Sequence, residues 1–234
     1  MSLFDERLRT IASMVPECNT VADIGCDHGH LLAELLASGR CRWGIAADIN
    51  PQPLEKARKE LERRNVSDRS ECRCTDGLTG IAPVTLDCVV IAGMGGGLIA
   101  DILSRFDYRE NPSITYILQP MQRPVTVRRF LYEHGFTLKE ERCCTVSGMF
   151  YTVMRAEYTG LATLSTPQAL YFGAVDLVND PLAPEMKQTV LSKAEKRLAG
   201  LVMAKPYEGR DAAISQMTHL LLALRKICQK APKD

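Results

Sequence analysis

Short apolar runs alternate with helical stretches along the chain from Thr20 to about Ser113. Several runs are rich in Val and Ile and apolar throughout, which is typical of a parallel sheet that helices cover on both faces. The pattern predicts strands over residues 21–24, 43–47, 70–74, 87–92 and 114–118, and helices over residues 31–38, 51–65, 98–106 and 125–134. Asn50 before Pro51 is expected to cap the second helix with its side chain.

The pattern changes after the fifth predicted strand. Residues 136–142 and 149–157, with Ser147 and Gly148 between them, predict an antiparallel hairpin that closes the sheet. Beyond Tyr158, apolar residues recur with coiled-coil spacing, first at Leu191, Ala194, Leu198 and Leu201 and then at Ile214, Met217, Leu221, Leu224 and Cys228. A breaker at residues 205–209 separates the two series and predicts two antiparallel helices. We therefore expect an α/β domain over residues 1–160 and a helical hairpin over residues 161–234.

Composition narrows the class of protein. The 234 residues are 46% hydrophobic and 24% charged, which excludes a disordered or low-complexity chain. No apolar run is long enough to cross a bilayer, and the mixed charges near Met1 are unlike an export signal, so we expect a cytoplasmic protein without membrane contact. The 9 cysteines include no CxxC pair and are expected to be reduced thiols rather than zinc ligands.

The net charge of +1 conceals a mildly basic tail. A basic surface there could contact nucleic acid, or it could be an ordinary solvated helix surface.

Two glycines, Gly25 and Gly29, mark the turn from the first predicted strand into the first predicted helix. Glycine there lets a ligand approach the backbone at the open carboxyl edge of the sheet. A dinucleotide site needs a further glycine between them, but this chain has Asp27 and His28, and a carboxylate would repel a pyrophosphate. It would attract a sulfonium or ammonium group, so the sequence favours S-adenosylmethionine over a nicotinamide cofactor. A metal-dependent hydrolase using Asp27, His28 and His30 is a weaker alternative, because the two histidines are awkwardly spaced for one ion.

Acidic residues also follow the second and third predicted strands. Asp48 could accept two hydrogen bonds from ribose hydroxyls. Asp76 and Gly77 offer an acceptor for an adenine amino group, and Leu78 could cover the adenine ring. Any one of them could instead be a helix cap or a turn residue. Their recurrence after successive strands favours a binding site.

Glycines crowd the end of the fourth predicted strand, at residues 93–97 around Met94. A flat ligand can lie against such a backbone, with Met94 as an apolar contact. A tight turn with Met94 in the core is the alternative. Gln119, at the end of the fifth predicted strand, could hydrogen-bond a base edge or tie a loop together.

Three stretches carry a more specific signal: ADIGCDHG at residues 22–29, IAGMGG at 91–96 and ILQP at 117–120. In this order and at these separations they resemble the bacterial tRNA (adenine(22)-N1)-methyltransferases, over nearly the whole chain. The resemblance implies a Rossmann-like class I methyltransferase fold, S-adenosyl-L-methionine as cofactor, and tRNA as the partner methylated at N1 of adenine 22. The helical tail looks like the family's C-terminal extension. Cys26 stands where the family more often has a small hydroxyl residue.

The resemblance also implies roles for individual residues. The first glycine turn would bind the methionine end of the cofactor through Asp23, Gly25, Cys26, Asp27, His28 and Gly29. Asp48 and Ile49 would bind the ribose, and Asp76, Gly77 and Leu78 would bind the adenine. The region where the methyl donor contacts the acceptor would be formed by Gly93, Met94, Gly95 and Gly96 with Gln119 and Pro120. The candidate catalytic residues are Asp27, Gly93, Met94 and Gln119.

Methyl transfer to N1 of adenine needs no general base, because N1 attacks with an in-plane lone pair and loses no proton. We expect alignment to dominate catalysis, helped by Asp27 or a backbone carbonyl near Gly93 that accepts from the adenine amino group. The base must be exposed or flipped. The candidate phosphate contacts are Arg123, Arg128, Arg129, Lys187, Lys193, Lys196 and Arg197, each of which could instead be a solvated helix charge.

Other functions stay open from the sequence alone. The chain could methylate another RNA or a small molecule, or it could bind RNA through a methyltransferase-like domain without activity. We expect a monomer, and a dimer through the C-terminal helices is the alternative.

Overall fold

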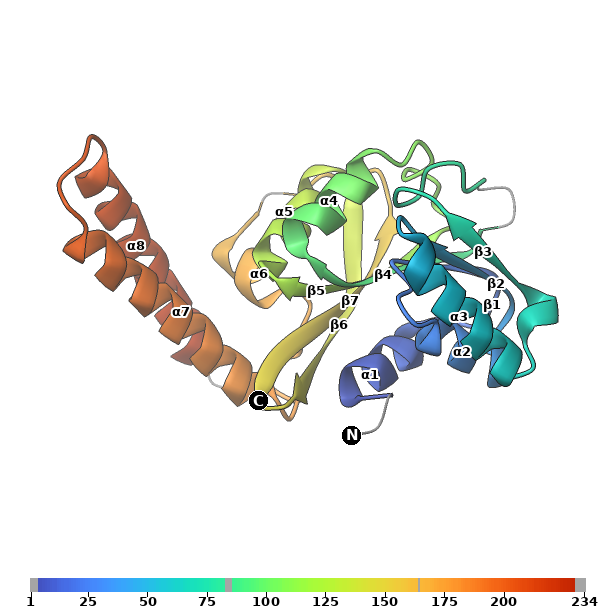
Figure 1. The fold of residues 1–234 in the computed structure, drawn as a ribbon. Coiled ribbons are helices and arrows are strands. Elements are labelled where there is room, and N and C mark those ends of the chain that lie inside the picture. The colour runs from blue at the N-terminus through green and yellow to red at the C-terminus, as the bar shows by residue number, and fades with distance from the viewer. Residues whose placement is uncertain (1–3, 83–85, 164, 230–234) are drawn as a thin grey trace.

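The computed structural model describes residues 4–82, 86–163 and 165–229, and a 7-stranded sheet runs through its centre (Figure 1). The order of the strands in the sheet is β3-β2-β1-β4-β5-β7-β6. The first five along the chain are parallel, whereas β7 pairs antiparallel with both β5 and β6. The predicted parallel sheet and its closing hairpin are thus confirmed. The strands are β1 (Cys18–Ile24), β2 (Cys41–Asp48), β3 (Ser70–Cys74), β4 (Cys88–Gly95), β5 (Thr115–Gln122), β6 (Phe136–Val146) and β7 (Met149–Tyr158).

Helices alternate with the strands along the chain, and the two tail helices lie beyond the β6 edge of the sheet (Figure 1). The helices predicted between the strands and the two tail helices are confirmed, with ends that differ by a few residues, whereas α1 and α6 were not predicted. A short 3-10 helix, η1 (Ser67–Arg69), leads into β3. The α-helices of the described residues are α1 (Glu6–Met14), α2 (His30–Ala37), α3 (Pro51–Arg63), α4 (Gly96–Ser104), α5 (Pro124–Glu133), α6 (Pro167–Phe172), α7 (Ala183–Met203) and α8 (Arg210–Gln229).

The two faces of the sheet are both buried, because successive residues of a strand point to opposite sides. On one face, helices α1 to α3 pack against Val21, Val90 and neighbouring residues in one apolar cluster. On the other face, helices α4 and α5 pack against Ala22 and Val89 in a second cluster. Val21 and Ala22 thus serve different cores although they are adjacent in sequence. Because both faces are buried, the sequences of several strands are apolar at every position.

Helix α1 is the element that the sequence pattern did not reveal. Asp5 caps it, since the Leu8 backbone N–H donates to Asp5 Oδ1 at 2.9 Å. Leu8, Ile11 and Val15 then follow at helical spacing and join the core on the α2 side of the sheet. The cap and the periodicity are both present in the sequence, but the run is short and follows directly on the start of the chain.

Two local expectations are corrected by the structure. The strand predicted over residues 87–92 does not end at a tight turn: β4 continues to Gly95 and stays paired with β5 through register shifts at Met94, which lies opposite Pro120. Asn50 does precede α3, but its side chain makes no capping hydrogen bond. Its backbone N–H instead donates to Asp48 Oδ1 at 2.9 Å, so Asp48 orders the turn before the helix.

The tail forms the predicted hairpin, with α7 and α8 side by side and projecting away from the sheet (Figure 1). Their facing residues Ala194, Met217, Leu221 and Leu224 are buried in a third apolar cluster, which also contains Phe172 of α6. The tail therefore has a small core of its own. That core is continuous with the chain segment that joins the tail to the sheet.

A buried ion pair anchors this joining segment. Arg128 of α5 and Glu141 of β6 have side chains that are 1% and 0% exposed. The guanidinium contacts the carboxylate through Nη2, at 2.5 Å from Oε1, and through Nε, at 3.1 Å from Oε2. Arg128 Nη1 also donates to the carbonyl oxygens of Leu170 at 2.8 Å and Tyr171 at 3.1 Å, both in α6. The prediction that Arg128 contacts RNA phosphates is therefore wrong, because its charge is neutralised inside the protein.

The turn after α6 packs against the buried pair of Arg128 and Glu141. Gly173 has φ of +60°, and a Cβ at this position would collide with the carboxylate of Glu141. The Ala174 N–H donates to Glu141 Oε2 at 3.4 Å. Glu141 thus fixes the point at which the chain turns from α6 toward α7.

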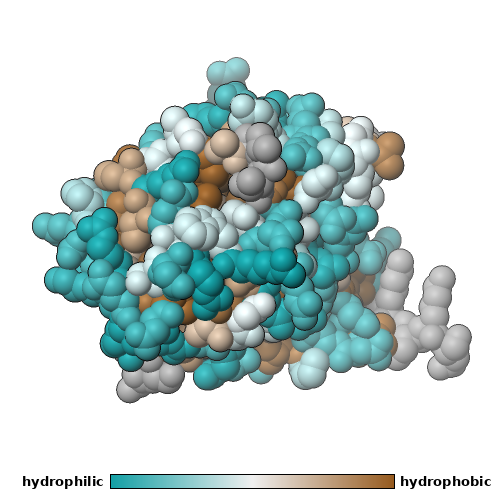
Figure 2. All heavy atoms as spheres, turned by 90° about the vertical axis from the view of Figure 1, so that its right-hand side faces the viewer, coloured by the Kyte–Doolittle hydropathy of each residue, from teal (hydrophilic) through white to brown (hydrophobic). Residues whose placement is uncertain are grey.

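The outer surface at the β3 end of the sheet is largely hydrophilic (Figure 2). Helix α3 contributes to it with ion pairs one turn apart, such as Arg58 with Glu55 at 3.2 Å and Arg63 with Glu60 at 2.7 Å. In the part of the chain that the structure describes, no helix combines the length and apolar character that a bilayer crossing requires.

We expect Glu141→Gln to destabilise the fold strongly. The substitution keeps the side-chain shape but leaves the charge of Arg128 buried without a counter-charge, which lowers the free energy of unfolding by ~3–5 kcal/mol. Glu140→Gln is the matched control, because Glu140 is 30% exposed and pairs with Arg142 and Arg155 near the surface. Its loss should stay below about 1 kcal/mol. Urea unfolding followed by circular dichroism measures both, and equal losses would contradict the anchoring role of the buried pair.

Candidate functional site

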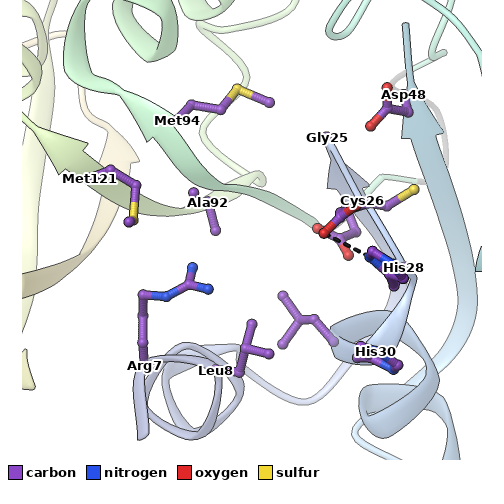
Figure 3. Close-up of a pocket in the computed structure, with 14 residues that line it drawn as sticks. Arg7, Leu8, Gly25, Cys26, His28, His30, Asp48, Ala92, Met94 and Met121 are labelled. Atoms are coloured by element: carbon purple, nitrogen blue, oxygen red, sulfur yellow. Dashed lines mark ion pairs between the residues drawn. The ribbon is translucent and has the colours of Figure 1, made fainter. Parts of the chain in front are cut away.

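A cavity of about 400 Å³ opens at the carboxyl ends of β1, β2 and β4, where the sequence placed the ligand site (Figure 3). Its volume falls in the range of ~300–1,000 Å³ that is typical of small-molecule sites. The first glycine turn, the end of β2 and the bulged end of β4 all contribute to its wall. The lining residues are Arg7, Leu8, Asp23, Gly25, Cys26, Asp27, His28, His30, Leu31, Asp48, Ala92, Gly93, Met94 and Met121.

The glycine turn between β1 and α2 needs its two glycines. Gly25 has φ of +71°, and a Cβ there would collide with the terminal methyl group of Met94. Gly29 has φ of +70° and is so close to Ala57 of α3 that a Cβ would lie 2.8 Å from the Ala57 Cβ. The turn therefore carries the backbone past the cavity and into α2, whose first-turn N–H groups have no partner within the helix.

Three carboxylates, those of Asp23, Asp27 and Asp48, line the same cavity. Asp23 is only 4% exposed. Burial, and then the nearby charges of Asp48 and Asp27, raise the pKa of Asp23 to about 7. The cavity thus has a strongly anionic side, as the sequence predicted for Asp27 and Asp48.

Cys26 lies on the same side of the cavity and is 7% exposed. Burial raises the pKa of its thiol well above the ordinary value, and the charges of Asp23 and Asp48 raise it further. The thiol is therefore protonated at neutral pH.

Arg7 and Leu8 of α1 line the cavity and were missed by the sequence reasoning, since α1 itself was not predicted. Arg7 lies across the cavity from Asp48 (Figure 3). The cavity therefore has a cationic group opposite its three carboxylates. This arrangement suits a ligand that carries both signs of charge, such as an amino acid.

Gln119 is fully buried and its amide is used inside the protein. Its Oε1 accepts from the Gly93 N–H and from Arg7 Nη1, each at 3.1 Å, and its Nε2 donates to the Pro120 carbonyl at 3.0 Å. Of the two roles predicted for Gln119, the structure shows the tying role: it joins β4, β5 and α1. Gln119 is thus a positioning residue for Gly93 and Arg7, and it does not line the cavity.

The predicted adenine contacts lie outside the cavity wall. The carboxylate of Asp76 pairs with Arg105 at the end of α4, with Nη1–Oδ2 of 2.8 Å and Nη2–Oδ1 of 3.2 Å, and this hydrogen bonding lowers the pKa of Asp76. Leu78 is buried in the core with Ile102, and a Cβ at Gly77 would touch the same Ile102. An adenine site at residues 76–78 stays a prediction. Ile49 beside Asp48 is 61% exposed, and Gly95 does not line the cavity.

The two histidines near the glycine turn have separate partners. His28 Nδ1 lies 2.8 Å from Asp27 Oδ2, the ion pair drawn in Figure 3, and His30 Nδ1 lies 3.3 Å from Glu60 Oε1. Their rings stack with centroids 5.8 Å apart. Among the described residues, no group of three or more His, Cys, Asp or Glu side chains is arranged to hold a metal ion.

A second set of predicted residues lies beyond the end of β5. Lys187 lines a different depression on α7, and Lys196 is exposed on α7 outside the groove described next. The remaining four candidates are exposed and line one groove of about 610 Å³ between α5 and α7, with no ion pair to any described residue; they are Arg123, Arg129, Lys193 and Arg197.

We expect Asp23 to lower the stability of the ligand-free protein as pH rises from about 4 to about 7. The pKa of Asp23 is about 7 in the folded chain, above its ordinary 3.8, so the folded state binds more protons than the unfolded state in this window. The loss amounts to at most ~4 kcal/mol. Asp23→Asn should flatten this dependence in urea titrations at several pH values, whereas Asp68→Asn on the exposed η1 should not. An unchanged pH slope in Asp23→Asn would contradict the assignment.

Comparison with known sequences identifies one family. The family model of the methyltransferase domain matches residues 4–154. The tRNA (adenine(22)-N(1))-methyltransferase of Bacillus subtilis (strain 168) is 33% identical over 152 residues, which are 65% of this chain and 64% of that enzyme. The sequence match therefore spans just under two thirds of that relative's length.

Solved structures extend the likeness over the tail. The crystal structure of the B. subtilis tRNA methyltransferase TrmK superposes with a TM-score of 0.84 at 25% identity, covering 96% of this chain and 98% of that one. Streptococcus pneumoniae Sp1610, solved in complex with S-adenosyl-L-methionine, superposes with a TM-score of 0.77 at 26% identity, covering 96% and 99%. These matches confirm the resemblance read from the three sequence stretches, and the chain belongs to the methyltransferase domain family.

Proposed function

We propose that this chain transfers a methyl group from S-adenosyl-L-methionine to N1 of adenine 22 in tRNA. The observation that carries the proposal is the cavity at the carboxyl ends of the strands, with Asp23, Asp27 and Asp48 on one side and Arg7 on the other. The name of the B. subtilis relative gives the reaction, and the S. pneumoniae neighbour was solved with this cofactor. The charges and volume of the cavity fit that cofactor.

The residues of the cavity fit the two ends of an amino-acid group. We infer that the ammonium and sulfonium centres face the carboxylates, and that Arg7 and the first turn of α2 bind the carboxylate of the cofactor. Oδ1 of Asp48 accepts from the Asn50 N–H, and its Oδ2, to which no described residue donates, can accept from a ribose hydroxyl. When bound, S-adenosyl-L-methionine supplies an electrophilic methyl group on a sulfonium centre.

The chain's own part in the reaction is then alignment and charge stabilisation. N1 of adenine loses no proton when it is methylated, so no residue has to act as a general base. The Gln119 amide fixes Gly93 and Arg7 and so holds the β4 edge of the cavity in place. Asp27 is 72% exposed in its side chain and can stabilise the positive charge that the methylated base acquires.

The proposed tRNA contacts are the four cations of the groove between α5 and α7. Arg123, Arg129, Lys193 and Arg197 carry no counter-charge from the described protein, so phosphates can neutralise them. We infer a division into a catalytic domain over residues 1–160 and a tRNA-contacting hairpin over residues 161–234. The exposed groove is common to both.

We further infer that the protein acts in the cytoplasm as a monomer. Cytoplasmic action is supported by its proposed tRNA substrate and by nine cysteines that are all free. The monomer is supported by the hairpin, whose facing apolar residues Ala194, Met217, Leu221 and Leu224 are buried within one chain.

Nucleoside analysis tests the activity. The protein is incubated with methyl-labelled S-adenosyl-L-methionine and an unmodified tRNA transcript, and the tRNA is digested and separated. We expect label in 1-methyladenosine, and none when the transcript carries guanine in place of adenine at position 22. Label in another nucleoside, or undiminished label in the guanine transcript, would overturn the proposed specificity.

Substitutions of two lysines on α7 test whether the groove binds tRNA. Lys193→Ala should weaken tRNA binding several-fold and reduce the slope of log affinity against log salt by about one, because one phosphate contact is lost. Lys196→Ala removes the same charge outside the groove and should leave both quantities unchanged. Filter binding at a series of salt concentrations measures the slopes. Equal effects of the two substitutions would mean that net charge, and not the groove, attracts the tRNA.

A further inference from the structure

A second cavity of about 370 Å³ lies between the first cavity and the cationic groove. It is enclosed by the end of β5, the start of α5, β7, α6 and α7. Met121 lines both the first and the second cavity. Arg123, Tyr171 and Lys193 line both the second cavity and the groove. The three hollows therefore form one series, from the open groove inward to the carboxylates.

The walls of the second cavity are aromatic and apolar. Its aromatic lining residues are Phe150, Tyr151 and Tyr171, and Met186 and Val190 of α7 also line it. Three cations also line it: Arg128 is neutralised by Glu141, whereas Arg123 and Lys193 are shared with the cationic groove. A flat aromatic ligand without net charge suits such walls, because bases stack on aromatic rings with little dependence on sequence.

One polar group in this wall has no partner. Thr152 is 4% exposed, and its hydroxyl makes no hydrogen bond to any described residue. Thr152 points to the same face of β7 as Phe150, because side chains alternate along a strand. A buried hydroxyl without a partner is costly to the fold. The Thr152 oxygen is closed off from solvent in this structure, and a rotation about χ1 would turn it toward the cavity that Thr152 lines. A hydroxyl both donates and accepts, so it can pair with the amino group or a ring nitrogen of a purine.

We propose that the second cavity receives the acceptor adenine, with its ring between the aromatic side chains and its edge hydrogen-bonded to the Thr152 hydroxyl. This inference rests on the proposed function. N1 is hidden in a paired and stacked base, so the nucleotide must be flipped into a pocket before it can react. The groove would hold the flanking phosphates, and the base would enter past Tyr171 and Lys193.

The order of charges along the series supports this occupant. Phosphates are attracted to the cationic groove but repelled by the carboxylates of the first cavity. The uncharged base can move further inward, to the wall at Met121 that the two cavities share. Methylation at N1 gives the base a positive charge, and the nearby carboxylates stabilise that charge. A nucleotide placed in this orientation presents its base, rather than its backbone, to the donor.

Two substitutions at Thr152 distinguish the effect of its hydroxyl group from the effect of its branched side-chain shape. Thr152→Val keeps the branched shape and loses the hydroxyl, whereas Thr152→Ser keeps the hydroxyl. We expect single-turnover methylation of tRNA to fall about tenfold in Thr152→Val and to stay near wild type in Thr152→Ser, as one hydrogen bond to the base is lost. Affinity for S-adenosyl-L-methionine and the melting temperature should not fall in Thr152→Val, since the hydroxyl has no partner in the protein.

A second pair of variants tests the cavity volume. Val190→Phe fills the cavity and should lower the methylation rate more than tenfold while cofactor affinity is unchanged. Val202→Phe adds the same bulk at a position on α7 that is 52% exposed and should be without effect. Melting temperatures verify that each variant is folded.

The outcomes distinguish this inference from the proposed function. If the wild-type protein does not methylate tRNA, the proposed function fails and the inference falls with it. If the wild type methylates tRNA and either Thr152→Val or Val190→Phe, once folded, keeps the wild-type rate, the base is bound elsewhere. The second cavity then takes another occupant, and the proposed function stands.

Discussion

The buried pair of Arg128 and Glu141 is the interaction on which the relation between the sheet and the tail depends. Two charges inside a protein are stable only when their hydrogen-bonding capacity is well used, because desolvation opposes burial. Here the guanidinium is shared among one carboxylate and two carbonyls of α6, and the carboxylate also accepts from the chain after Gly173. The pair thereby holds α6 against α5 and β6. Arg128 itself lines the second cavity, and Tyr171, whose carbonyl it binds, lines both the second cavity and the cationic groove.

The molecule separates its charges although the net charge is only +1. Carboxylates gather where β1 and β2 end, and cations with no ion pair to any described residue gather between α5 and α7. Opposite fields at two neighbouring sites give a polyanion and a cationic small molecule different places to bind. A balanced composition can therefore conceal two strongly charged sites, and the net charge of the chain says little about either.

The sequence predicted most of the sheet because its strands are apolar runs between strong breakers. It also placed Asp27 and Asp48 at the cavity, since the carboxyl ends of neighbouring parallel strands must meet. It could not distinguish Arg128 from Arg129: the two are adjacent on α5, and only the position of distant Glu141 makes one of them an internal charge. In the same way, Arg105 takes the carboxylate of Asp76, and Arg7 with Gly93 takes the amide of Gln119. Contacts between residues far apart in the chain decided each of these outcomes, and local pattern does not contain them.

Cys26 has a chemical consequence for a site that handles an alkylating agent. A thiolate is among the strongest nucleophiles in proteins, and an electrophilic methyl group held beside one would be at risk of transfer to the enzyme itself. Burial and the neighbouring carboxylates keep this sulfur protonated and thus poorly reactive. If the cavity binds a sulfonium as proposed, the same anionic wall that attracts it also lowers the thiolate fraction of Cys26 and thus its methylation by the cofactor.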